Sequence, residues 1–238
     1  MKTFEHDNFD AIELKTQTVD GKRHYVTPSG EKYPSVTTVL SILSRDAIIA
    51  WRKRVGNEEA NRISTTASRR GTKFHKLCEQ YINNELDESF KGCMPEEKAM
   101  FKNVQSFIDN KIGRIIAQEV ALYSDKLKIA GRVDLVAQWD GEYSIIDFKT
   151  SKKVKTNEQV IPYKQQICAY AVCFEEMYGI KINNGIILMS AYNASDMLAP
   201  RTNMWQFDPF CYLDELQDTI DKYKQHRMKR QAEKLMEA

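Results

Sequence analysis

Apolar positions with helical spacing dominate the first half of the chain. A helical pattern rich in basic residues covers residues 47–82, and a second predicted helix covers residues 95–112, with Pro95 in its first turn. The apolar positions of this second helix are Phe101, Val104, Phe107, Ile108 and Ile112. Ahead of both, the turn Pro28-Ser29-Gly30 predicts a hairpin, and Ser35 is the expected N-cap of a helix over residues 36–43.

The second half alternates between strand and helix patterns. Strands are predicted over residues 116–123, 129–139, 143–149, 185–190 and 204–207, and a helix over residues 163–178 that ends before Gly179. The chain closes with an amphipathic helix whose apolar stripe is Leu213, Leu216, Ile220 and Tyr223. This order predicts an α/β core, a central mixed β-sheet flanked by helices, with an N-terminal helical cap.

One domain is predicted, because no repeat, low-complexity tract or flexible linker interrupts the 238 residues. Residues 1–113 are expected to form the N-terminal hairpin and helical cap. Residues 114–210 are expected to form the α/β core, and residues 211–238 the C-terminal helix.

Charge and hydropathy narrow the choice of partners. The net charge is only +2, with 35 basic and 33 acidic residues, so a nucleic-acid site would have to come from local clustering of cations. No apolar run reaches the ~18 residues that span a bilayer, so no membrane partner is expected. The first ten residues include acidic side chains and no apolar stretch, so neither a signal peptide nor a transit peptide is predicted. We therefore expect a cytoplasmic protein.

The five cysteines are scattered and include no Cys-x-x-Cys pair. Zinc and iron–sulfur sites need closely spaced ligands, so we expect buried, reduced thiols instead.

Residues 129–149 are the most informative segment. Asp140-Gly141 between two strand patterns is typical of a two-residue hairpin loop. Such a loop pairs Trp139 with Glu142 and, further along, places Asp134 opposite Asp147 at a non-hydrogen-bonded position, where Cα atoms are ~4.5 Å apart. Lys149 shares a face with Asp147, and Arg132 would lie opposite it.

Two facing carboxylates repel each other, and apolar neighbours strengthen this repulsion by excluding water. Those neighbours are apolar on both faces: Val133, Leu135, Val136, Ile145, Ile146 and Phe148. Burying two acids there is costly unless something compensates. Mg²⁺ favours one or two carboxylates together with water and phosphate oxygens, so a metal site is predicted, with Lys149 partly neutralising the pair. The alternative is an α/β interaction domain in which both acids pair with lysines.

Several other candidates stay open on spacing alone. His75, Gln166 and Tyr170 fit ordinary amphipathic helices as well as a functional site. Glu119, in an apolar strand, is either a solvent-facing residue or a third acid near the metal. The basic residues of the N-terminal helices fit a phosphate-binding surface and a solvated helix face equally well.

Four motifs occur together in one order. They are Gly71-Thr72-x-x-His75, Gly131-Arg132-Val133-Asp134, Ile146-Asp147-Phe148-Lys149-Thr150-Ser151 and Gln166-x-x-x-Tyr170. The set resembles the PD-(D/E)XK nuclease superfamily and, within it, the RecB-like branch, in particular the mitochondrial genome maintenance exonucleases and their phage and bacterial relatives. The likeness extends from Tyr33-Pro34-Ser35-Val36-Thr37 to the C-terminal helix. Asp134 follows Arg-Val rather than Pro, a departure common in the superfamily.

The resemblance implies a restriction-endonuclease-like core and a set of catalytic residues. His75, Asp134, Asp147 and the backbone carbonyl of Phe148 would hold Mg²⁺ or Mn²⁺. Lys149 would orient or deprotonate the attacking water, and Gln166 and Tyr170 would support the site. Cas4-type relatives carry an iron–sulfur cluster, which is not expected here because no cysteine follows Cys211.

The activity implied is metal-dependent hydrolysis of DNA, from the ends of single strands, in replication, recombination or repair. The helical cap would form a passage for the strand, and the host would be a bacterium or a phage-infected cell. Candidate DNA contacts are Ser35, Thr37, Arg54, Arg69, Arg70, Lys73, Arg132, Thr150, Ser151 and Lys152. A structure-specific or duplex endonuclease on the same core, and a catalytically silent DNA-binding accessory protein, remain alternatives. Protein partners are not indicated.

Overall fold

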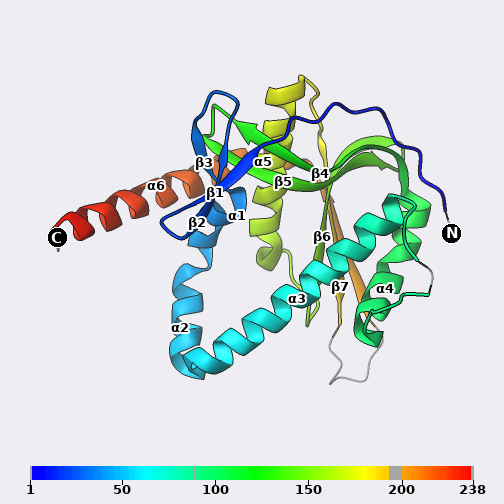
Figure 1. Cartoon of the computed structure of the whole chain (residues 1–238), viewed down its shortest axis with the longest axis horizontal. Coiled ribbons are helices and arrows are strands. Elements are labelled where there is room, and N and C mark those ends of the chain that lie inside the picture. The colour runs from blue at the N-terminus through cyan, green and yellow to red at the C-terminus, as the bar shows by residue number, and fades with distance from the viewer. Residues whose placement is uncertain (1, 88, 193–199, 237–238) are drawn as a thin grey trace.

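A five-stranded mixed sheet forms the centre of the molecule (Figure 1). The computed structural model describes residues 2–87, 89–192 and 200–236. The strands, in sheet order, are β4 (Ile112–Ser124), β5 (Ile129–Trp139), β6 (Glu142–Ser151), β7 (Asn184–Ala191) and β8 (Arg201–Phe207). Neighbouring strands are antiparallel except β6 and β7, which are parallel. The predicted α/β core with a mixed sheet is confirmed.

The hairpin between β5 and β6 has the predicted register. Asp140 and Gly141 both have positive φ, 51° and 87°, as a two-residue type I′ loop requires. Trp139 pairs with Glu142, and the ladder runs in this register as far as Leu135 and Ile146. It ends one step before Asp134 and Asp147, so the predicted pairing of these two acids across the ladder does not form, and they lie where the strands cease to pair.

The predicted position of Arg132 opposite Lys149 is wrong for the same reason. Beyond the end of the β5–β6 ladder each strand pairs only with its other neighbour. Arg132 pairs with Ala121 of β4, and Lys149 pairs with Met189 of β7.

Helices cover both faces of the sheet, and the helix on one face lies in the crossover that the parallel pair of β6 and β7 requires. The crossover from β6 to β7 contains a 3₁₀ turn, η2 (Glu158–Val160), and α5 (Ile161–Tyr178). Gly179, in the left-handed conformation, ends α5 as predicted. Figure 1 shows α5 on one side of the sheet and α3 (Asn57–Ile82) with α4 (Pro95–Lys111) on the other. Successive sheet residues therefore enter different cores, Leu135 the α3–α4 side and Val136 the α5 side.

The N-terminal region forms a small antiparallel sheet of β1 (Lys15–Val19), β2 (Lys22–Val26) and β3 (Lys32–Pro34). The β2–β3 hairpin matches the predicted one, whereas β1 was not predicted because its sequence, KTQTV, has no apolar alternation. The predicted helix over residues 36–43 is an α-helix, α1 (Val36–Leu40), followed by a 3₁₀ turn, η1 (Ser41–Leu43). Ser35 caps it, accepting a hydrogen bond from the backbone N–H of Thr38 at 3.1 Å.

The helical pattern over residues 47–82 is two helices rather than one. Gly56, with φ of 84°, separates α2 (Arg45–Val55) from α3. None of the side chains of α2 is buried, and apart from Ala60 those of α3 are buried only from Phe74 onward. These two helices therefore form an arm that leaves the body and returns to it (Figure 1), hereafter the α2–α3 arm.

The C-terminal helix is α6 (Leu213–Met236), preceded by a 3₁₀ turn, η4 (Pro209–Tyr212). Its predicted stripe is buried at Leu216, Ile220 and Tyr223 and half-buried at Leu213. Past this stripe the helix extends away from the body (Figure 1). Residues 237 and 238, included in the predicted helix, lie outside the described residues.

Two expectations from composition can be compared with the structure. Cys78, Cys168 and Cys173 are buried free thiols as predicted, while Cys93 is half-buried and Cys211 is exposed. Across the described ranges, no helix has both the length and the apolar character needed to span a bilayer.

The close packing of β7 against α5 and η4 gives a stability prediction. A Cβ built on Gly185 would lie 2.8 Å from Cγ2 of Ile167 and 3.1 Å from Cγ of Pro209. Gly185→Ala should therefore lower the free energy of unfolding by about 1–3 kcal/mol through overpacking. The matched control is Gly71→Ala in α3, where the nearest atom would be 3.9 Å away, and helix propensity should raise stability by about 0.5–1 kcal/mol. Urea denaturation measures both, and equal effects of the two substitutions would contradict this packing.

Candidate active site

The site lies where β5 and β6 stop pairing, between α3 on one face of the sheet and α5 on the other. The structure brings the predicted catalytic residues together from four elements. They are His75 from α3, Asp134 from β5, Asp147 and Lys149 from β6, and Gln166 and Tyr170 from α5.

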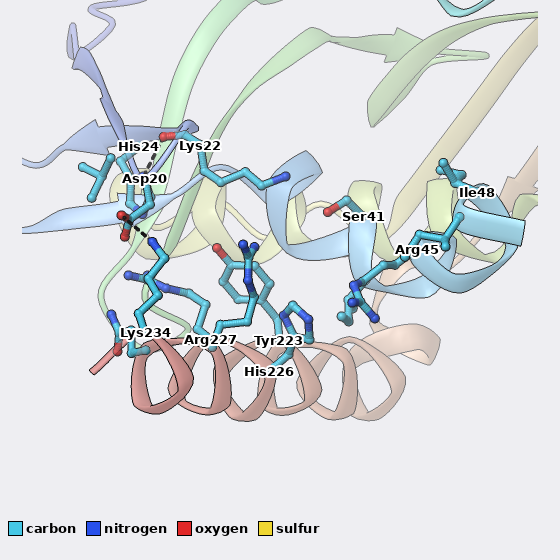
Figure 2. Close-up of a pocket in the computed structure, with 15 residues that line it drawn as sticks. Asp20, Lys22, His24, Ser41, Arg45, Ile48, Tyr223, His226, Arg227 and Lys234 are labelled. Atoms are coloured by element: carbon cyan, nitrogen blue, oxygen red, sulfur yellow. Dashed lines mark hydrogen bonds and ion pairs between the residues drawn. The ribbon is translucent and has the colours of Figure 1, made fainter. Parts of the chain in front are cut away.

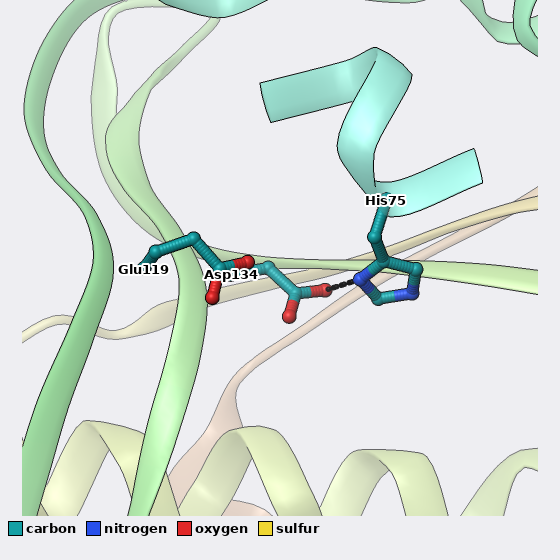
Figure 3. Close-up of side chains that lie close together, drawn as sticks. All are labelled: His75, Glu119 and Asp134. Atoms are coloured by element: carbon teal, nitrogen blue, oxygen red, sulfur yellow. Dashed lines mark ion pairs between the residues drawn. The ribbon is translucent and has the colours of Figure 1, made fainter. Parts of the chain in front are cut away.

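Asp134 is held from two directions. Its Oδ2 atom lies 3.3 Å from Nδ1 of His75 (Figure 3), and the same oxygen accepts a hydrogen bond of 2.8 Å from the backbone N–H of Phe148. That N–H bond replaces the ladder between the two strands at this point. The strand separation thus gives a carboxylate the backbone donor that a neighbouring strand would otherwise use.

Asp147 is fully buried and depends on two side chains. Its Oδ2 atom forms an ion pair with Lys149 Nζ, and its Oδ1 atom accepts a hydrogen bond of 3.1 Å from Nε2 of Gln166. Lys149 Nζ also lies 5.3 Å from the ring centroid of Tyr163, a contact that the sequence did not indicate. Lys149 is therefore directed at the acid beside it and held over an aromatic face.

Gln166 and Tyr170 act as one unit because they are one turn apart on α5. Gln166 Nε2 donates to the Tyr170 hydroxyl at 3.2 Å as well as to Asp147. The ring of Tyr170 passes very close to β5, since a Cβ on Gly131 would lie 2.7 Å from its Cε1 atom. Glycine in the Gly131-Arg132-Val133-Asp134 motif thus leaves room for the tyrosine that supports the site.

Glu119 is the one acid of the site that was left open by sequence reasoning and omitted from the predicted catalytic set. It lies on β4 between Gln118 and Val120, which pair with Leu135 and Val133 on either side of Asp134. One ligand atom each from His75, Glu119 and Asp134 lie within 4.8 Å of one another (Figure 3). The signal was an acid in an apolar strand, but the register that places it beside Asp134 depends on the β4–β5 turn, which the sequence does not mark.

The backbone at Glu119 is strained. Its φ is 53°, a left-handed conformation that a glutamate in a strand rarely adopts. Arg132 Nη1 donates a hydrogen bond to the Glu119 carbonyl oxygen. Strain of this kind persists only where the surroundings enforce it, and it is frequent at functional sites.

The pKa values of the three acids are shifted in different directions. Burial raises the pKa of Asp147 to about 6, although Lys149 opposes this. Burial, and then the charge of Asp134, raise the pKa of Glu119 to about 7. For Asp134, burial acts upward, but the charge of His75 and the hydrogen bond to it outweigh burial and lower the pKa.

The same acids shift the pKa values of the two basic side chains of the site. Burial alone would lower the pKa of His75, but Asp134 outweighs it and the pKa is raised. Burial would likewise lower the pKa of Lys149, and Asp147 overcomes it, so this pKa is raised too. The negative charge of the site thus strongly favours bound cations.

These residues fit a divalent cation. Asp147 is buried, and its Oδ2 atom contacts Lys149 Nζ. Carboxylate oxygens with an imidazole nitrogen suit Mg²⁺ and Mn²⁺. His75, Glu119 and Asp134 form a ligand group within 4.8 Å, and the predicted ligand Asp147 is not part of that group.

The candidate DNA contacts differ in their surroundings. Thr37, Arg54, Arg69, Lys73, Arg132 and Lys152 are exposed, and Thr150 and Ser151 are half-buried at the end of β6. Thr150 lies beside α3 at Gly71, close to the site. Ser35 is buried, with its hydroxyl 2.7 Å from Thr38 Oγ1, and Arg70 lies 3.9 Å from Glu96. Both side chains therefore have visible structural partners.

Comparison with known proteins supports the resemblance drawn from the four sequence motifs. The model of the PD-(D/E)XK nuclease superfamily matches residues 50–236. Mitochondrial genome maintenance exonuclease 1 of Mus musculus is 25% identical over 173 residues, and that of Homo sapiens is 25% identical over 175 residues. Each alignment covers 68% of this chain, and 51% and 50% of the respective relatives. The Xenopus tropicalis protein is also 25% identical, with 49% of its length covered.

The chain spans about half the length of these curated relatives. The resemblance deduced from the four motifs is confirmed at the level of the superfamily. Because the family match runs from the α2–α3 arm to the C-terminal helix, well over half of the sequence, this chain belongs to the PD-(D/E)XK nuclease superfamily.

Proposed function

We propose that the chain is a divalent-cation-dependent deoxyribonuclease that hydrolyses phosphodiester bonds from the ends of single-stranded DNA. The observation that carries this proposal is the pair of acids, buried Asp147 and half-buried Asp134, with Lys149 and His75 directed at it. A purely structural ion pair between Lys149 and Asp147 would not need a second acid, Asp134, beside it.

The proposed roles follow from the contacts. His75, Asp134, Asp147 and the Phe148 carbonyl would hold Mg²⁺ or Mn²⁺, with Glu119 as a further ligand. When bound, the cation polarises the scissile phosphate and lowers the pKa of a coordinated water. Lys149 orients the attacking water or stabilises the developing negative charge. Gln166 and Tyr170 hold Asp147 in place through the hydrogen bonds described above.

Two observations support DNA ends as the substrate. The curated relatives are named exonucleases. The α2–α3 arm exposes Arg54, Arg69 and Lys73, and its second helix, α3, also carries His75. A strand that reached the active site along this arm would therefore pass cationic side chains. A role in DNA replication, recombination or repair follows from such an activity.

Lys149→Ala should reduce cleavage by at least about 100-fold, because it removes the group proposed to act next to the nucleophile. Asp147→Asn should have a similar effect. The control is Lys126→Ala, which removes an exposed lysine from the β4–β5 turn and should leave the rate unchanged. Initial rates on an end-labelled single strand measure the effect. A Lys149→Ala protein that folds and binds DNA yet cleaves at a near wild-type rate would place the chemistry elsewhere.

An end-dependent enzyme should degrade linear single strands and leave circular ones of the same sequence intact. Linear duplexes should be cut more slowly than linear single strands. A gel assay in Mg²⁺, with chelator as the blank, separates these substrates. Cleavage of the circles at the linear rate would instead favour the endonuclease alternative, and activity in chelator would contradict the metal requirement.

Without metal, the protein should lose stability as the pH rises from about 4 to above 7. The pKa values of Asp147 and Glu119, at about 6 and 7, and that of His75 are all raised, so the native state binds more protons than the unfolded state in this window. Saturating Mn²⁺ should therefore raise the Tm more at pH 8 than at pH 5.5, since the cation competes with protons.

Glu119→Gln is the informative variant in that experiment. It removes one of the raised groups, so its stability in chelator should depend less steeply on pH than that of the wild type. Thermal unfolding across the pH range checks this without any activity assay. A stability in chelator that rises between pH 5 and pH 8 would contradict the electrostatics of the site.

A further inference from the structure

A second groove lies away from the proposed catalytic residues. It is bounded by α6, by the β1–β2 hairpin and by the segment where η1 leads into α2 (Figure 2), and its volume is about 310 Å³. None of the residues assigned to the metal, to catalysis or to DNA contacts lines it. In Figure 2 the side chains of α6 point across the groove toward the hairpin.

The groove is strongly cationic in a protein that is nearly neutral. Its lining contains five lysine or arginine side chains and a single carboxylate: Lys22, Arg45, Arg227, Arg230, Lys234 and Asp20. The chain as a whole has a net charge of only +2. A large part of the basic excess of the molecule is therefore gathered here, which favours an anionic ligand.

Most of this charge is not neutralised within the protein. Asp20 pairs with Lys234 at 3.5 Å, and Arg45 pairs with exposed Asp46 at 2.8 Å. Lys22, Arg227 and Arg230 form no ion pair with any residue in the described ranges. Surface pairs of the kind that Arg45 makes are weak and are easily exchanged for a stronger anion.

The spacing of these residues on α6 is that of one helix face. Arg227, Arg230 and Lys234 recur at intervals of three and four residues, and His226 lies four residues before Arg230, so all four line the side of the helix that faces the groove. Like charges at this spacing destabilise an isolated helix. A polyanion lying along the face would remove that repulsion.

The groove also presents apolar surface beside the cations. Ile48 and Ile49 at the start of α2 are 45% and 40% exposed, and both line the groove. A single nucleic-acid strand offers phosphates and unpaired bases together, and proteins bind such strands with cationic grooves combined with side chains on which the bases stack. Because these isoleucines line a concave groove, a flexible strand fits the site better than a flat lipid surface does.

The α2–α3 arm connects this groove to the active site. Arg45 begins the arm and His75 lies on its second helix, so about 30 residues at ~1.5 Å each set an upper limit of ~45 Å between them. A strand of stacked nucleotides at ~3.4 Å per residue covers that distance with about 13 nucleotides. A single strand of moderate length can therefore occupy both places at once.

We propose that this groove binds the backbone of the single-stranded DNA whose end occupies the active site. The proposal rests on the proposed function and adds to it a second anchoring point outside the catalytic centre. It predicts that the affinity for single strands increases with length up to the span between the two places.

The test compares Arg227→Glu/Arg230→Glu with Lys222→Glu/Lys229→Glu. Both pairs reverse two charges on α6, but Lys222 and Lys229 are exposed and do not line the groove. Fluorescence anisotropy in chelator measures the Kd of labelled 6-nucleotide and 24-nucleotide single strands of matched composition, over a series of salt concentrations. Circular dichroism verifies folding, and Arg227→Gln/Arg230→Gln serves if the reversed pair does not fold.

The groove variant should bind the 24-nucleotide strand at least about tenfold more weakly than the wild type at ~0.1 M salt. The slope of log Kd against log salt should fall by about 1.4, since each lost phosphate contact contributes ~0.7 for single strands. The affinity advantage of the long strand over the short one should shrink accordingly, while the Lys222→Glu/Lys229→Glu protein keeps it.

Equal behaviour of the two variants on the long strand would overturn the proposal. It would also be overturned if the groove variant lost binding to phosphatidylserine vesicles while its DNA binding stayed intact. Failure of the proposed function is seen separately, as absence of cleavage of either strand by the wild type in Mg²⁺. The binding measurement in chelator tests whether the groove binds single-stranded DNA, independently of the cleavage result.

Discussion

The architecture of the site depends on two carboxylates inside an apolar sheet, Asp147 buried and Asp134 half-buried. Moving an unpaired carboxylate out of water costs several kcal/mol, and a neighbouring acid adds repulsion. Asp134 and Asp147 are tolerated because the strands stop pairing beside them, which frees the Phe148 N–H for Asp134 and leaves space for Lys149 and Gln166 beside Asp147. The remaining deficit of positive charge, shown by the raised pKa of Asp147, is what a divalent cation would supply.

The two faces of the sheet contribute different parts of that compensation. From the α5 side come Gln166 and Tyr170, packed so closely that only glycine fits at position 131. From the α3 side comes His75, on the returning half of an arm whose first half is exposed. A rigid support on one face and a more accessible element on the other would allow a strand to reach the acids without disturbing the residues that hold them.

The sequence predicted those features that follow from local chemistry. The Asp140-Gly141 loop determined the register of β5 against β6, and this register was sufficient to bring Asp134, Asp147 and Lys149 together. Helices with clear apolar stripes, such as α4 and α5, were located within a few residues. The roles of His75, Gln166 and Tyr170 came only from the resemblance, because their spacing fits an ordinary helix equally well.

The features that were missed depend on interactions distant in sequence or on the backbone itself. The separation of the strands at Asp134 depends on β4, β7 and α5 rather than on the hairpin. The place of Glu119 depends on a bulged strand and a left-handed φ that its sequence does not favour. The break at Gly56 between α2 and α3 could have been recognised, since glycine inside a helical pattern can mark the end of a helix. The basic groove could not, because its cations lie on three elements that only the fold brings together.

Calorimetric titration with Mn²⁺ near pH 7 is the most direct test of the idea that a bound cation offsets the buried acids. The wild type should bind Mn²⁺ and release protons on doing so, because groups with raised pKa values must ionise to bind it, and Asp134→Asn/Asp147→Asn should bind far more weakly. Equal affinity in the two proteins, or binding by the wild type without proton release, would show that the acids are accommodated by the protein alone.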